Sequence, residues 1–151
     1  MMQLANGRIL LMALLGVAVL VAAAGCDRLS SNAGDLAVGE CFDEPAAEEQ
    51  EVEDVQRRPC NEAHTAEVVF VGDIAGATDT YPAQDQFLDA VRNQCVPAFN
   101  TYTGRDYDTD QELDIGYFIP TEEGWNIGDR ELICYAVRVD AAPMTQSVKG
   151  S

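Results

Sequence analysis

The chain has 151 residues, a formal net charge of −17 and a pI near 4.1. This length accommodates one domain of ordinary size. The acidity excludes a typical nucleic-acid-binding protein, which needs a basic face to meet the phosphates, and it excludes electrostatic binding to anionic lipid. Attachment to a membrane would therefore have to be hydrophobic or covalent.

The N-terminus has the organisation of an export signal. Arg8 and the α-amino group precede an uninterrupted apolar run over residues 9–24. At 1.5 Å per residue this run covers about 24 Å, less than the ~30 Å hydrocarbon core of a bilayer. The sequence Ala-Ala-Gly-Cys at residues 23–26 resembles a bacterial lipobox, so we predict a lipoprotein signal peptide over residues 1–25 and lipidation of Cys26. An ordinary secretory signal and an uncleaved anchor helix are the alternatives.

Residues 26–37 are predicted to be a flexible tether, because they are rich in Ser, Asn, Gly and Asp and have little apolar content. Export and lipidation would place the folded part on the extracytoplasmic face of the cell membrane, where cysteines tend to pair. Once Cys26 is assigned to the lipid, four of the five cysteines remain, an even number. The lipoprotein and disulfide predictions therefore support each other.

The first half of the folded part contains two predicted strands. Residues 37–42 form the first, and a β-branched and aromatic run predicts the second over residues 67–71. Between them, residues 43–54 hold seven carboxylates in twelve positions, and repulsion at this density predicts an exposed loop. Ca²⁺ binding by this loop is the less favoured alternative. Residues 72–80 are rich in turn formers.

A helix is predicted to begin at Asp85, which can serve as its N-cap. Apolar residues at three- and four-residue intervals predict its buried face, which comprises Phe87, Leu88, Val91, Cys95 and Phe99. Pro97 lacks an amide donor and would clash with the carbonyl of Asn93, so we expect the helix to kink or end just before Pro97. A last turn can restart after the proline and should stop at Gly104.

The remainder of the chain combines an acidic segment with two more strands. Acidic residues alternate over residues 106–114 and would share one face of an extended chain. An EF-hand loop would need glycine and glutamate where this chain has Gln111 and Tyr117, so we expect a solvated edge or loop, with another kind of Ca²⁺ site as the alternative. We predict strands over residues 113–120 and 131–139, a turn over 121–124, and a polar tail over 141–151.

The four remaining cysteines allow three disulfide pairings. We favour Cys41–Cys60, which closes the acidic loop with a near neighbour, and Cys95–Cys134, which joins the buried helix face to the last strand. Loop closure predicts a stabilisation of about 3 kcal/mol for the first disulfide and about 4 kcal/mol for the second. No cysteine spacing approaches the C-x2-C of a zinc site, so no metal or cofactor is expected. The predicted fold is α+β, a small antiparallel sheet packed with one main helix and held by two disulfides.

The residue inventory disfavours most enzyme classes. Serine is scarce beyond the tether, the four cysteines are assigned to disulfides, and His64 is the single histidine, whereas catalytic zinc sites use two or three. A carboxylate pair for glycoside cleavage is the remaining enzymatic alternative. His64 is expected to hydrogen-bond the backbone or a carboxylate such as Glu62 or Glu67. Contact with a ligand through His64, Glu67 or Trp125 is the less favoured interpretation of these residues.

An ordered set of motifs resembles the septum-formation domain of actinobacterial envelope proteins. The motifs are Val38-Gly39-Glu40-Cys41-Phe42, Pro59-Cys60 followed by His64-Thr65-Ala66-Glu67-Val68, Cys95 with Phe99 and Tyr102-x-Gly104, Pro120-Thr121, Trp125 with Gly128-Asp129-Arg130, Cys134, and Thr145-x-Ser147-x-Lys149-Gly150. We therefore assign a septum-formation-like domain to residues 38–151. One departure is Ala63, where the family often has proline.

The resemblance implies a secreted, lipid-anchored or membrane-anchored protein associated with septum formation or the cell envelope, with no established enzymatic activity and no catalytic residues. We accordingly expect a non-enzymatic interaction module that is held on the membrane by its lipid and that meets envelope or division proteins. One alternative is an envelope domain that binds a cation or small ligand through residues 106–114. A carboxylate-dependent cell-wall enzyme is less favoured.

Overall fold

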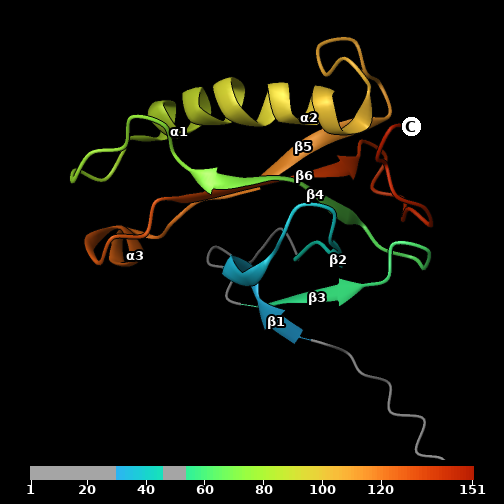
Figure 1. The fold of residues 1–151 in the computed structure, drawn as a ribbon, viewed down its shortest axis with the longest axis horizontal. Coiled ribbons are helices and arrows are strands. Elements are labelled where there is room, and N and C mark those ends of the chain that lie inside the picture. The colour runs from blue at the N-terminus through green and yellow to red at the C-terminus, as the bar shows by residue number, and fades with distance from the viewer. Residues whose placement is uncertain (1–29, 46–53) are drawn as a thin grey trace, which may run out of the picture.

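The computed structural model describes residues 30–45 and 54–151. The predicted signal peptide and Cys26 lie outside the described residues, as does most of the predicted acidic loop. In the described part, six strands form one antiparallel sheet in the order β1-β3-β2-β4-β6-β5 (Figure 1). The strands are β1 Ser30–Asn32, β2 Cys41–Asp43, β3 Asp54–Arg58, β4 Ala66–Asp73, β5 Leu113–Phe118 and β6 Glu131–Arg138.

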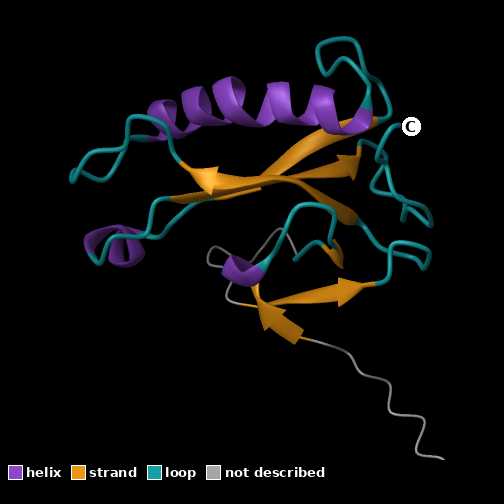
Figure 2. Cartoon of the chain, in the orientation of Figure 1, coloured by secondary structure: helices purple, strands orange, loops and turns teal. Residues whose placement is uncertain are grey.

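One helical run lies across the face of β4, β6 and β5 (Figure 2). It consists of α1 Gln84–Ala90, η2 Val91–Cys95 and α2 Val96–Thr103, which follow one another without a break. Gly104 ends the run at φ 77°, a left-handed conformation that glycine adopts without steric cost. The predicted fold class, an antiparallel sheet with one main helix and two disulfides, is therefore confirmed. Within residues 30–45 and 54–151, none of the helices combines the length and the apolar content that a membrane span needs.

Of the two outcomes predicted at Pro97, the helix does not end there: it continues as α2 and stops at Gly104, as predicted. Its segment η2 is a π-helical turn, and the N–H of Val96 bonds the carbonyl of Val91, five residues earlier. This wider turn comes immediately before the proline, where the ordinary hydrogen-bond ladder has to be interrupted. The helix also begins one residue before Asp85, with Ala83 as its N-cap. Leu88, predicted on the buried face, is 48% exposed.

The core has two layers, one on each face of the sheet. The layer under the helix contains Phe87, Phe99, Trp125, Leu132 and Cys134, and the layer on the opposite face contains Phe42, Val55, Val68, Ile133 and Tyr135. The central strand β4 contributes to both layers, so four consecutive residues from its start are buried. On β5, Gly116 leaves the space that the Tyr135 ring of the neighbouring strand fills, because a Cβ at this position would overlap the ring.

Both favoured disulfides are present. Cys41 is bonded to Cys60 with a Cα–Cα separation of 5.3 Å, and Cys95 to Cys134 with a separation of 5.7 Å. The first ties β2 to the turn that precedes β4. The second ties η2 to β6, since Cys95 lies on the buried face of the helix as predicted.

The two ends of the described chain differ from their predictions. Within the predicted tether of residues 26–37, Ser30–Asn32 pairs with β3, and Leu36 is buried in the core beyond the short helix η1 Ala33–Asp35. The sheet therefore begins earlier than the predicted domain start at residue 38. The predicted polar tail of residues 141–151 is also bound to the fold, because Met144 and Val148 are buried.

Candidate functional site

The buried polar residues of the fold lie mainly at the start of β4. Glu67 is fully buried, and its carboxylate accepts three hydrogen bonds. Its Oε1 accepts from the hydroxyls of Tyr102 and Ser147, both at 2.6 Å, and its Oε2 accepts from the N–H of Val148 at 2.7 Å. One donor belongs to α2 and two to the C-terminal segment. The carboxylate therefore joins three parts of the chain that are distant in sequence.

The Glu67 carboxylate also affects the ionisation of its neighbour. Burial and the hydrogen bond to Glu67 raise the pKa of Tyr102 to about 12. Loss of the phenol proton would place a second negative charge beside a carboxylate in a poorly solvated site. The Tyr102 hydroxyl is therefore a donor to Glu67 throughout the neutral pH range.

His64 is fully buried two residues before β4 begins. Its Nδ1 lies 2.8 Å from the backbone oxygen of Glu62, and since a carbonyl can only accept, Nδ1 carries the proton of this bond. Its backbone pairs with that of Met144 through hydrogen bonds of 3.0 and 2.7 Å. The other ring nitrogen, Nε2, is buried and has no hydrogen-bond partner among the described residues. Of the partners expected for His64, the structure provides the backbone.

His64 and Glu67 lie next to the Cys41–Cys60 disulfide. The Sγ of Cys41, a ring nitrogen of His64 and a carboxylate oxygen of Glu67 all lie within 4.8 Å of one another, and all three residues are buried. We call these three residues the His64 cluster. In the part of the chain that the structure describes, no other group of three or more His, Cys, Asp or Glu side chains comes close enough to hold a metal ion together.

Trp125 belongs to a separate set of contacts. It lies on α3 Glu122–Asn126, the one-turn helix found where a turn was predicted, at the opposite end of the sheet from the C-terminus (Figure 1). The indole is 1% exposed and donates through Nε1 to the carbonyl of Thr78 at 3.1 Å. The guanidinium of Arg130 lies 4.0 Å from the ring centroid. The structure therefore brings His64 and Glu67 together but places Trp125 elsewhere, in the core.

The alternating carboxylates of residues 106–114 lie in a largely exposed loop that leads into β5, one of the two forms predicted for this segment, and they do not share one face. Residues 106–109 form a turn, in which the N–H of Thr109 bonds the carbonyl of Asp106. Arg105 forms ion pairs with Asp110 at 3.1 Å and with Glu112 at 2.9 Å. Asp114, at the start of β5, accepts a hydrogen bond from the hydroxyl of Tyr107 at 2.8 Å. The acidic side chains are thus used in local contacts, and no three of them converge as a cation site requires.

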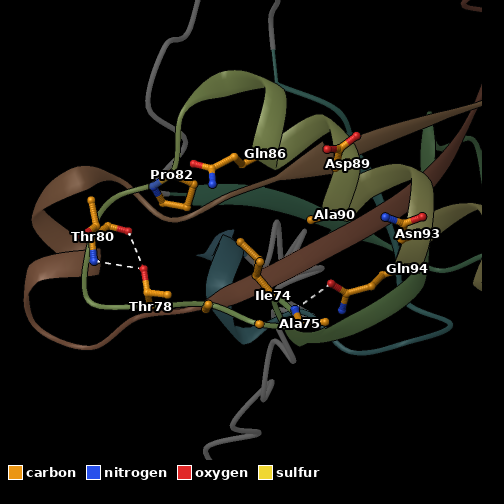
Figure 3. Close-up of a pocket in the computed structure, with 12 residues that line it drawn as sticks. Ile74, Ala75, Thr78, Thr80, Pro82, Gln86, Asp89, Ala90, Asn93 and Gln94 are labelled. Carbon is orange, nitrogen blue, oxygen red and sulfur yellow. Dashed lines mark hydrogen bonds between the residues drawn. The ribbon is translucent and has the colours of Figure 1, made fainter.

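A pocket of about 350 Å³ between the loop after β4 and the helix is a feature that the sequence did not indicate (Figure 3). The loop contributes Ile74 and Thr78, and the helix contributes Gln86, Asp89 and Gln94. The two amide side chains are used internally. Gln94 bonds the backbone of both Ala75 and Asp73, at 2.8 and 2.9 Å, and Gln86 accepts from the N–H of Ala83 at 2.9 Å. The pocket walls are therefore held by the same groups that a polar ligand would need.

Comparison with known proteins places these features in a family. No curated protein and no solved structure matches the chain at a significant level. The family model described as septum formation matches residues 38–151, which include both disulfides and the His64 cluster. Because this match covers well over half of the sequence, the chain belongs to the septum formation family.

Proposed function

We propose that this protein is a lipid-anchored, extracytoplasmic interaction module that takes part in septum formation without catalysing a reaction. Family membership links the chain to septum formation. The observation that carries the rest of the proposal is the burial of His64 and Glu67, two polar residues within the part of the chain that the family model matches. Both are engaged in bonds that hold the C-terminal segment, so their burial supports an architectural role.

The proposed anchor rests on the N-terminal sequence. The apolar run of residues 9–24 ends in a lipobox-like Ala-Ala-Gly-Cys, and acyl chains contribute about 0.8 kcal/mol for each buried CH₂. Cys26→Ala should abolish membrane retention or precursor processing, as measured by cell fractionation and by the mass of the protein. A Cys26→Ala variant that fractionates and is processed like the wild type would contradict the anchor.

The net charge of the chain indicates the kind of partner to expect. A net charge of −17 favours a partner with a basic face and predicts association that weakens as salt is added. Proximity labelling in dividing cells, followed by co-purification at low and high salt, should recover envelope or division proteins that bind with this salt dependence. Recovery of no such protein would contradict the interaction module.

The absence of catalysis is tested separately. The purified chain should release no soluble fragments from isolated cell wall during prolonged incubation. Release that is abolished by one Asp or Glu substitution would instead support a carboxylate-dependent enzyme.

A further inference from the structure

We propose that the His64 cluster binds one Zn²⁺ ion when a dithiol reduces the adjacent disulfide. The ligands are the thiolates of Cys41 and Cys60, the free ring nitrogen of His64 and a carboxylate oxygen of Glu67. In the disulfide form Cys41 has no thiolate to offer, and zinc binds thiolate sulfur. The redox state of one bond would therefore decide whether the site exists.

The positions of the side chains suit this ion. The Sγ of Cys41, a ring nitrogen of His64 and a carboxylate oxygen of Glu67 lie within 4.8 Å of one another. Around a tetrahedral Zn²⁺ with bonds of 2.0–2.3 Å, neighbouring ligand atoms lie about 3.5 Å apart. A contraction of at most about 1.3 Å would bring the three into place. Cys60 would supply the fourth ligand, because its sulfur is bonded to that of Cys41 before reduction.

His64 is already arranged as a metal ligand. In metal sites the nitrogen that does not bind the ion commonly donates its proton to a carboxylate, a backbone carbonyl or water, which fixes the tautomer of the ring. Here Nδ1 donates to the carbonyl of Glu62 at 2.8 Å. The lone pair is therefore on Nε2, which is buried and has no hydrogen-bond partner among the described residues. A bound ion would satisfy this otherwise unpaired nitrogen.

Glu67 has a lone pair left for the ion. A carboxylate offers about four acceptor sites, and the donors from Tyr102, Ser147 and Val148 occupy three of them. Only one of these donors is on Oε2. The same three bonds hold the carboxylate in a single orientation, which is the role that hydrogen bonds around a metal ligand perform.

Reduction supplies the thiolates in a balanced exchange. A dithiol passes two electrons and two protons to the Cys41–Cys60 disulfide and itself becomes a disulfide, and zinc then displaces the two thiol protons. Solvent exposure favours reduction of the Cys41–Cys60 disulfide over that of Cys95–Cys134. Cys60 is partly exposed, whereas Cys95 and Cys134 are both fully buried, so an attacking thiolate reaches the first disulfide more readily.

The test is a metal titration of the full chain in detergent. The first disulfide is reduced with a phosphine, which is oxidised to its oxide with oxygen from water, and thiol mapping by mass spectrometry identifies the reduced cysteines. Co²⁺ is then added as a spectroscopic probe and displaced with Zn²⁺. The reduced chain should bind one equivalent of Co²⁺ with a sulfur-to-cobalt charge-transfer band, and the oxidised chain should bind none.

Substitutions in the His64 cluster test whether the Co²⁺ is bound there. His64→Gln and Glu67→Gln should each weaken binding at least tenfold, and Glu62→Gln, which changes an exposed carboxylate of the same turn, should not. If the near-UV circular dichroism of either cluster variant shows loss of the fold, Cys60→Ser at the partly exposed position should show the same weakening. Absence of stoichiometric uptake by the reduced wild type would overturn the proposal, and so would equal uptake by the variants that fold.

Discussion

Replacing Glu67 by alanine should destabilise the fold far more than a typical substitution. The change removes three charge-assisted hydrogen bonds and leaves the buried N–H of Val148 without an acceptor. An unsatisfied buried donor costs about 1–3 kcal/mol. The hydroxyls of Tyr102 and Ser147 lie nearer the surface and can recover water, so their loss adds less. We expect the free energy of unfolding to fall by about 3–5 kcal/mol.

Urea unfolding followed by the fluorescence of Trp125 measures this change, since it is the single tryptophan and is buried. With a slope near 2 kcal/mol per molar urea, the midpoint should shift by roughly 2 M. Hydrogen exchange should also show the amide of Val148 losing its protection. Glu62→Ala, at an exposed carboxylate of the same turn, is the matched control and should change stability by no more than about 0.5 kcal/mol. A loss below 1 kcal/mol with a protected Val148 amide would refute the role assigned to Glu67.

Two further predictions concern one residue in each of the two core layers. The pKa of Tyr102 is about 12 in the folded protein against 10.0 for a free phenol, so the folded state holds the phenol proton more tightly than the unfolded state. The stability that this proton contributes should be fully present below pH 10 and be lost between about pH 10 and 12. Tyr102→Phe should lack this step in thermal melts across that range, and an unchanged pH slope would exclude Tyr102 as its origin. Gly116→Ala should cost about 1–3 kcal/mol in urea unfolding, because the new methyl group would displace the Tyr135 ring, and wild-type stability would show that the ring moves freely.

The helix and the main strands could be predicted because their signals are local. Apolar spacing of three and four residues identified the buried face on which Phe87, Cys95 and Phe99 lie. Once Cys95 was on that face and Cys134 on a strand, their disulfide followed from the geometry of a helix packed on a sheet. Leu88 was wrongly assigned to this face because a pattern of adjacent apolar residues cannot say which of them is turned outward.

The two ends of the described chain could not be predicted because long-range contacts hold them. Residues 141–151 are mainly polar, and their attachment depends on Met144, Val148 and a hydrogen bond to Glu67 across 81 residues of sequence. Likewise, β1 exists through pairing with β3, which no local pattern near Ser30 indicates. Composition predicts disorder correctly only when no distant partner is available to a segment.

The acidic run of residues 106–114 was predicted as an edge or a loop, and its own side chains decide between the two. Alternation describes one face only if the chain is extended, and aspartate side chains compete with extended structure by bonding nearby backbone amides. The carboxylate of Asp106 accepts from the N–H of Asp108, and that of Asp110 accepts from those of Glu112 and Leu113. The same residue type that suggested a shared face therefore bends the chain and removes it.

The position of Glu67 shows why a buried polar residue in a central strand resists interpretation from sequence. β4 is covered on both faces, so alternation carries no information about which of its residues face a partner. Burying a carboxylate is unfavourable unless donors meet it, and here the donors come from Tyr102 on α2 and from the C-terminal segment. The donors that satisfy this one side chain are thus, together with the buried Met144 and Val148, the reason why the polar C-terminal segment lies against the core.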